Sequence, residues 1–157
     1  MGVTVTEGKA STLGFEEAYC AHRLTLLRLA YLMSGSHELS EDAVQSAFTS
    51  AHARWDQIEQ PLAYLKKAVI NLVKDGQRRR FRLLASTPER PLVALPPEVD
   101  EMWDQVARLP WAQRVVVVLH YYEDLSLVEI AAILDRRAAT VRSDHRRALD
   151  KLRKEIV

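Results

Sequence analysis

The fold of the C-terminal part of the chain is decided by residues 125–153, LSLVEIAAILDRRAATVRSDHRRALDKLR. Ser126 and Glu129 have the spacing of a capping box, in which each side chain bonds the other residue's free backbone amide, so a helix begins there. About four residues, 135–138, separate this helix from a last one that we expect from about Ala139 to Ile156. Two helices joined by so short a turn are typical of a helix-turn-helix.

The last helix has two different faces. Its inward stripe is predicted at Val141, His145, Ala148 and Leu152, which recur at three- and four-residue spacing. The outward residues near its N-terminal half are then Arg142, Ser143, Arg146 and Arg147. Arginine pairs bidentately with guanine and a helix N-terminus favours phosphate, so this face suits DNA in the major groove. A basic amphipathic helix taken alone is more often a solvated face, but the capped helix and short turn before it favour the DNA interpretation.

The N-terminal part also has helical periodicity. Apolar residues at three- and four-residue spacing predict a helix from Phe15 to Met33, which Gly35 ends. A second helix is expected from about Glu38 to Trp55, and Pro61 suits the first turn of a third helix that runs into the arginine cluster. Cys20 is expected to be a small core residue. The β-branched run VVVVL at 115–119 is interpreted as helix, because a lone strand would have no partner.

Length and composition favour a folded protein of two small domains. The chain has 157 residues, of which 48% are hydrophobic, and no apolar run that could span a membrane, so we expect a cytoplasmic protein. Four prolines between residues 86 and 97 mark a linker. We therefore predict an all-α fold with a flexible tail at 1–10, a first domain at 11–85, a proline-containing acidic linker at 86–98 and a second domain at 99–157.

The distribution of charge is more informative than its sum. The net charge is only +1, which argues against a protein that grips nucleic acid by bulk electrostatics. Basic islands at 74–82 and 136–154 nevertheless flank an acidic connector. Trp55 and Tyr64 precede the first island, and aromatic residues beside cations can stack on single-stranded bases, although a core role is the common one.

The sequence shows no catalytic centre. The five histidines are scattered, and no nucleophile, phosphate-binding glycine loop or metal-ligand spacing accompanies them or the single cysteine. We therefore expect a protein that is not an enzyme and that has no cofactor and no metal.

Two stretches together carry a family resemblance. SEDAVQSAFTSAHARWDQIEQPLAYLKKAVINLVKDGQRRR (40–80) and LPWAQRVVVVLHYYEDLSLVEIAAILDRRAATVRSDHRRALDKLR (109–153) resemble the two conserved regions of an extracytoplasmic-function (ECF) sigma factor of the sigma-70 superfamily, of the short actinobacterial, SigE-like kind. The resemblance implies a region 2 helical bundle that binds core RNA polymerase and opens the minus-ten element. It also implies a region 4 helix-turn-helix that reads the minus-35 element.

The resemblance assigns roles to particular residues. DAVQ resembles the motif that binds the β′ clamp helices, and the face that carries it has Glu41, Asp42, Gln45 and Thr49. WDQIEQP resembles the loop that captures a flipped minus-ten base, and the helix after it resembles the one along the minus-ten strand. The implied minus-ten residues are Trp55, Tyr64, Lys67, Asn71, Lys74 and Arg78. The implied minus-35 residues are Thr140, Arg142, Ser143, Arg146 and Arg147.

The resemblance also implies partners, and it has departures. Core polymerase, through its β′ clamp helices and β flap, and promoter DNA are the implied partners, and an anti-sigma factor is a further candidate. Asp135 stands in the turn where many members have glycine, and Asp144 and His145 replace the usual basic and apolar residues. An acid at Asp144 could repel phosphate or accept from a cytosine amine, so the resemblance assigns no single role to it and does not give the minus-35 sequence. Two alternatives stay open: a helix-turn-helix regulator that acts without polymerase, and a sigma-like module that titrates an anti-sigma factor.

Overall fold

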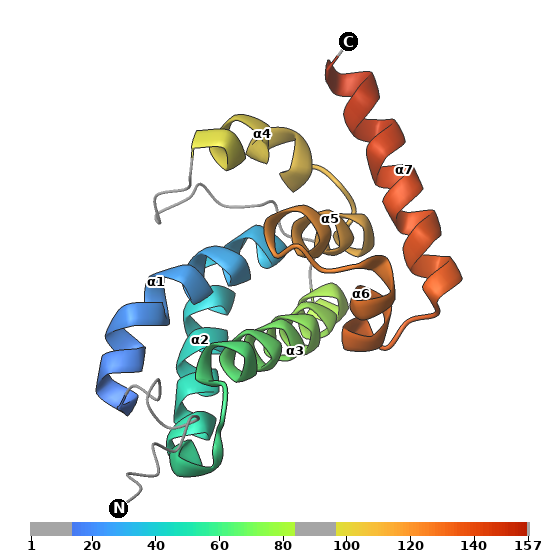
Figure 1. Cartoon of the computed structure of the whole chain (residues 1–157). Helices are drawn as coiled ribbons and strands as arrows, with labels where there is room; N and C mark the ends of the chain where they lie inside the picture. Colours follow the sequence, from blue (N-terminus) through green and yellow to red (C-terminus); the bar gives the residue numbers. More distant parts are fainter. Residues whose placement is uncertain (1–13, 84–96, 157) are drawn as a thin grey trace, which may run out of the picture.

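The computed structural model describes residues 14–83 and 97–156, and within these ranges it contains helices and no strand (Figure 1). The all-α prediction is therefore confirmed. The elements are α1 (Phe15–Ser34), α2 (His37–His52), η1 (Trp55–Gln57), α3 (Pro61–Leu83), α4 (Pro97–Ala107), α5 (Trp111–Val117), η2 (Val118–Tyr122), α6 (Leu127–Leu134) and α7 (Ala138–Ile156).

The helix ends follow local chemistry. Gly35 ends α1 in the left-handed conformation, with φ 67°, and the Ser36 side chain then accepts from the Leu39 N–H to begin α2. At α6, the Glu129 N–H donates to Ser126 Oγ and the Ser126 N–H donates to Glu129 Oε2, each at 3.1 Å. Both bonds of the predicted capping box are thus present.

Two helices differ from the prediction in their details. α2 ends at His52, and Trp55 begins a separate 3-10 turn, η1. The segment after Pro110 is helical through Tyr122 as predicted, but its last part, η2, widens into a π-helix. The VVVVL run is helix, as the sequence analysis interpreted it.

Cys20 was predicted to be in the core, and this is wrong: it is exposed on α1. A helix turns by about 100° per residue, so Cys20 lies about 200° around the axis from the buried Ala18. The buried face continues instead through Leu26, Leu29 and Met33.

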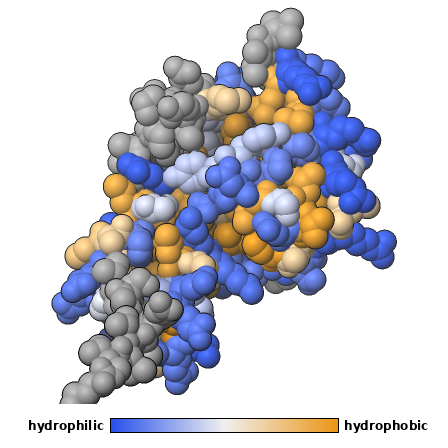
Figure 2. All heavy atoms as spheres, viewed as in Figure 1, coloured by the Kyte–Doolittle hydropathy of each residue, from blue (hydrophilic) through white to orange (hydrophobic). Residues whose placement is uncertain are grey.

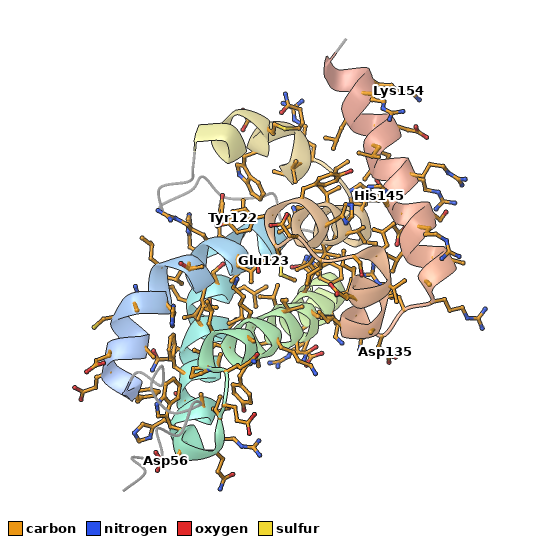
Figure 3. All side chains as sticks on the ribbon, in the orientation of Figure 1. Asp56, Tyr122, Glu123, Asp135, His145 and Lys154 are labelled. Atoms are coloured by element: carbon orange, nitrogen blue, oxygen red, sulfur yellow. The ribbon has the colours of Figure 1, made fainter. Side chains whose placement is uncertain are left out.

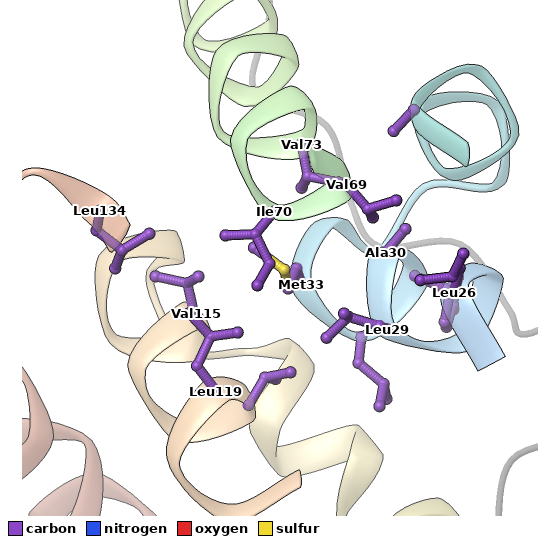
Figure 4. Close-up of a cluster of buried hydrophobic side chains, with 14 of the residues drawn as sticks. Leu26, Leu29, Ala30, Met33, Val69, Ile70, Val73, Val115, Leu119 and Leu134 are labelled. Carbon is purple, nitrogen blue, oxygen red and sulfur yellow. The ribbon is translucent and has the colours of Figure 1, made fainter. Parts of the chain in front are cut away.

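The two predicted domains pack against each other. Figure 1 shows the C-terminal end of α1 beside α5, and the end of α3 beside α6. Met33 and Ile70 of the first group of helices belong to one buried cluster with Val115, Leu119 and Leu134 of the second group (Figure 4). The apolar faces of both groups therefore form one continuous core.

Arg114 of α5 stabilises the packing of the two groups of helices. Its side chain is buried, and its Nε donates to the Met33 carbonyl at 3.0 Å, Nη2 to the Ser34 carbonyl at 3.4 Å and Nη1 to the Ala107 carbonyl at 3.1 Å. The last turn of α1 has no basic residue of its own, so the guanidinium supplies the positive charge that a helix C-terminus favours. Each such charge-assisted hydrogen bond contributes about 1.5–3 kcal/mol.

The predicted domain bounds fall partly outside the described residues. The tail at 1–10 and the linker as far as residue 96 lie there, as do the outer residues of the first domain at 11–13 and 84–85. The last two residues of the predicted linker, Pro97 and Glu98, are already helical and begin α4.

Candidate polymerase and nucleic-acid interfaces

The exposed side of α7 is basic. Arg142, Arg146 and Arg147 are exposed, Thr140 is exposed at the first turn, and Ser143 is half-buried. Along the edge of the molecule where α7 lies, hydrophilic residues predominate (Figure 2). The helix-turn-helix that the sequence predicts is present as α6, a short turn and α7, and the arginines lie on the exposed side of its second helix.

The opposite side of α7 holds the helix in place. Val141, Ala148 and Leu152 are buried, as the stripe predicted, and they pack in the shared core. His145 is half-buried, lies on the side of α7 that faces α5 and η2 (Figure 3), and its Nε2 is 2.9 Å from the Tyr121 hydroxyl. The His120 ring lies 5.1 Å from the His145 ring, centroid to centroid. Burial, and secondarily the proximity of His120, lowers the pKa of His145.

Asp144 belongs to the inward side as well. Only 9% of the residue is exposed, and its Oδ2 lies 3.4 Å from Arg136 Nη1. The same nitrogen donates to the Ala112 carbonyl at 3.2 Å, and the guanidinium lies 5.3 Å from the centre of the Trp111 ring. Burial lowers the pKa of Arg136, Asp144 raises it, and the positive charge of Arg78 lowers it further. Asp144 therefore links the turn to α7 and lies on the buried side of the helix, not on the exposed side with the arginines.

The turn itself begins with a left-handed residue. Asp135 caps the C-terminus of α6 with φ 53° and ψ 50°, a conformation that glycine adopts most readily. Its backbone N–H bonds the carbonyls of Ala131 and Ala132. The aspartate thus takes the left-handed cap position that glycine commonly fills at helix ends, at a conformational cost.

The candidate minus-ten residues follow one side of α3. Lys67 and Arg78 are exposed, and Asn71 and Lys74, which recur between them at helical spacing, are half-buried. Tyr64 is half-buried one turn before them. The side chains of residues 80–82, which complete the arginine cluster, lie outside the described ones.

Trp55 has a partly structural role. It is half-buried in η1, and its ring is perpendicular to the Phe15 ring with centroids 5.4 Å apart. Close by, a hollow of about 440 Å³ lies between α1 and the start of α3. Its lining includes His22 of α1, Glu59 and Gln60 of the loop, and Lys66 of α3. The loop that was expected to capture a base therefore borders a concave site of ligand size.

The candidate polymerase-binding residues lie on the exposed side of α2. Asp42, Gln45, Glu41 and Thr49 are all exposed. Glu41 forms an ion pair with Arg23 of α1 at 2.9 Å, and the Thr49 hydroxyl donates to the Gln45 carbonyl. Asp42 and Gln45 therefore offer the side-chain groups best placed for a partner.

Sequence reasoning missed one ion pair that joins the two groups of helices. Lys66 Nζ of α3 lies 2.9 Å from Glu123 Oε2, directly after η2. Neither residue stood out, because long-range pairing leaves no local pattern. In the described part of the chain no cluster of three or more histidine, cysteine or acidic residues could hold a metal ion, and no helix there is long and apolar enough to cross a membrane.

Comparisons with known proteins identify both halves of the chain. Residues 18–82 match the family described as Sigma-70 region 2, and residues 100–152 match Sigma-70, region 4. The RNA polymerase sigma-E factor of Streptomyces coelicolor is 32% identical over 154 residues, which cover 92% of this chain and 87% of the relative. The ECF RNA polymerase sigma factor SigW of Bacillus subtilis is 28% identical, and the alignment covers 83% of this chain and 82% of SigW.

A solved structure has the same fold. The sigma factor RpoE of Bartonella quintana, crystallised with the anti-sigma factor NepR, superposes with a TM-score of 0.66 over 89% of this chain and 94% of that chain, at 22% identity. The two matched regions, their order along the chain and the full-length relatives lead to one conclusion: the chain belongs to the ECF sigma factors of the sigma-70 family.

Proposed function

We propose that this chain binds core RNA polymerase and directs it to promoters, without catalysing a reaction itself. The observation that carries the proposal is the pairing of two surfaces on one chain: an arginine-lined α7 in a helix-turn-helix and a polar, basic side of α3. Because core RNA polymerase acts in the cytoplasm, we propose the same location for this chain. The members of this family are initiation factors and not enzymes, which supports the same reading.

The second domain reads the minus-35 element through the N-terminal half of α7. Arg142, Arg146 and Arg147 are the base or phosphate contacts, because they are exposed on the side away from the core. Thr140 and Ser143 add hydroxyl groups near the helix N-terminus, which favours phosphate. Inward anchoring by Asp144 and His145 fixes the orientation of this face.

The first domain binds the opened minus-ten strand. Lys67, Asn71, Lys74 and Arg78 follow the strand along α3, and Tyr64 and Trp55 present aromatic surface for base stacking. The hollow between α1 and the start of α3 receives the flipped base, since its polar rim can bond a base edge and its volume of about 440 Å³ lies within the range of ligand sites.

The outer side of α2 binds the β′ clamp helices of the polymerase. Asp42 and Gln45 are the principal contacts, with Glu41 and Thr49 beside them. The β flap is the partner of the second domain. We assign the first domain to 11–85 and the second to the residues from the start of α4 to 157, so that Pro97 and Glu98 move from the predicted linker at 86–98 into the second domain. An anti-sigma factor is a further candidate partner.

Reconstituted transcription tests the proposal. Purified chain added to core enzyme is expected to start RNA synthesis from a cognate promoter, while the chain alone binds the same duplex weakly. A regulator that acts without polymerase would bind the duplex tightly alone and would not join core enzyme. A titrating module would bind an anti-sigma factor but neither DNA nor core enzyme.

A further inference from the structure

The ion pair between Lys66 and Glu123 joins a candidate DNA-binding site to the second domain. Lys66 lines the hollow between α1 and α3 and is adjacent to the exposed Lys67. Glu123 lies at the junction of the two groups of helices (Figure 3), and only 8% of its side chain is exposed, against 30% for Lys66. The carboxylate thus reaches out of the second domain to a cation at the rim of the hollow.

The length of this ion pair would suit a phosphate oxygen as well as a carboxylate oxygen. The distance of 2.9 Å between Lys66 Nζ and Glu123 Oε2 is the distance at which a lysine binds a phosphate oxygen. The hollow that Lys66 borders is the one we assign to the flipped base, so a nucleotide held there would bring its phosphate to the same rim. Glu123 therefore occupies the position of an anionic ligand.

The position of Lys66 on α3 explains why the second domain can reach it. Ile70 and Val73, which follow Lys66 at helical spacing, are buried in the shared core. Lys67 lies one residue further around the helix and stays exposed. Lys66 is consequently at the boundary between the side of α3 that faces the second domain and the side that faces solvent.

Stability alone gives little reason for a pair at this boundary. A partly buried ion pair costs about as much in desolvation as it returns, and apolar residues in its place would often stabilise as well. A second, anionic ligand that binds Lys66 when the two domains separate would explain why a lysine stands at this position.

We infer that Lys66 is a phosphate-binding residue of the minus-ten interface, and that Glu123 occupies it while the two domains are packed together. This inference rests on the proposed function of the first domain. The Glu123 carboxylate competes with a DNA phosphate for the ammonium group of Lys66. In the free chain Glu123 therefore takes the place of that phosphate. When the second domain moves away, Lys66 becomes available beside Lys67.

The test is binding of the free full-length chain to a short fluorescein-labelled oligothymidylate, followed by fluorescence anisotropy over a series of salt concentrations. Glu123→Gln is expected to bind severalfold more tightly than the wild type. The plot of log affinity against log salt should become steeper by about 0.7, the value for one additional phosphate neutralised on a single strand. Asp124→Asn is the matched control, because Asp124 is the next residue, is exposed and carries the same charge.

A double variant separates the local contact from a change in net charge. Glu123→Gln combined with Lys66→Gln should return the salt slope to the wild-type value. The inference is overturned if Asp124→Asn steepens the slope as much as Glu123→Gln, or if the double variant keeps the gain. Circular dichroism of each variant checks that the helices remain folded.

A second measurement distinguishes this inference from the proposed function. In reconstituted transcription at raised salt, Lys66→Gln should lower open-complex formation severalfold, and Lys66→Arg should restore it. Full activity of Lys66→Gln in a wild-type system that transcribes normally would remove Lys66 from the interface and leave the proposed function intact. A wild-type chain that never joins core enzyme would instead refute the proposed function, whatever the oligothymidylate shows.

Discussion

Asp144 of α7 and Arg136 of the preceding turn form an ion pair on the inward side of the recognition helix, with Oδ2 and Nη1 3.4 Å apart. Asp144, the acid that is unexpected in a DNA-binding helix, thus holds the turn against α7. We expect Asp144→Ala to lower the free energy of unfolding by about 1–3 kcal/mol, because it leaves a half-buried guanidinium without its carboxylate. Chemical denaturation measures this effect.

The same substitution should leave the minus-35 preference of the holoenzyme unchanged. Asp150→Ala, which removes an exposed acid from the same helix, is the stability control and should have little effect. A changed preference for a cytosine in selected minus-35 sequences would show that Asp144 reads a base.

Arg142 is exposed in the first half of α7 and is expected to contact a base. Arg142→Ala should then weaken recognition of the cognate minus-35 element by about 1–3 kcal/mol, with a smaller loss on a scrambled element. Lys151→Ala, on the C-terminal half of the same helix, serves as the control for charge. Equal losses on both elements would make Arg142 a phosphate contact.

Asp42 and Gln45 share the exposed side of α2, three residues apart, so both can reach one partner. Changing both to alanine should weaken holoenzyme formation while the melting temperature stays near that of the wild type. Gel filtration with core enzyme follows the association. Ser46→Ala and Ser50→Ala are controls on the same helix, and normal assembly of the double variant would exclude the two residues from the interface.

Asp135 adopts a left-handed conformation at the end of α6. Asp135→Gly is expected to raise the free energy of unfolding by about 0.5–1 kcal/mol, because glycine takes this conformation without the Cβ clash. Thermal unfolding is the measurement, with Asp135→Ala as the comparison that should destabilise. A less stable glycine variant would mean that the aspartate side chain makes a compensating contact.

His145 should make stability depend on pH. Burial and His120 lower its pKa in the folded protein, so the unfolded chain binds the proton more readily. Stability is therefore lost as pH falls below about 6.5, the usual pKa of an unfolded histidine, and regained as pH rises through that window. His145→Gln should flatten the unfolding profile between about pH 5 and 7 relative to His52→Gln, and an unchanged slope would contradict this account.

Local signals in the sequence predicted much of the fold. The Ser126–Glu129 capping box, Gly35 and Pro61 act within a few residues, and each begins or ends a helix as expected. The inward stripe of α7 was predicted from three- and four-residue spacing at Val141, His145, Ala148 and Leu152. Asp144 lies three residues after Val141 and shares the same side of the helix. The burial of Asp144 depends on its ion pair with Arg136, and no local sequence pattern reveals that partner.

Contacts between distant segments were not predictable in the same way. Arg114 lies among buried valines, which local periodicity alone does not explain, and its carbonyl partners at Met33 and Ser34 are far away in the sequence. The Lys66–Glu123 pair is equally remote. Periodicity predicts which side of a helix is apolar but not which other helix covers it, so the single core emerged only from the structure.

Arg114 and the continuous core stabilise the packed arrangement, so any separated arrangement of the free chain would have a higher free energy. A ligand that binds only the separated form has its apparent affinity reduced by the fraction of molecules in that form. Each 1.4 kcal/mol by which the packed form is favoured thus costs about tenfold in apparent affinity. Substitutions in the core between α1 and α5 would consequently tune how readily the chain engages its partners without touching any surface that meets them.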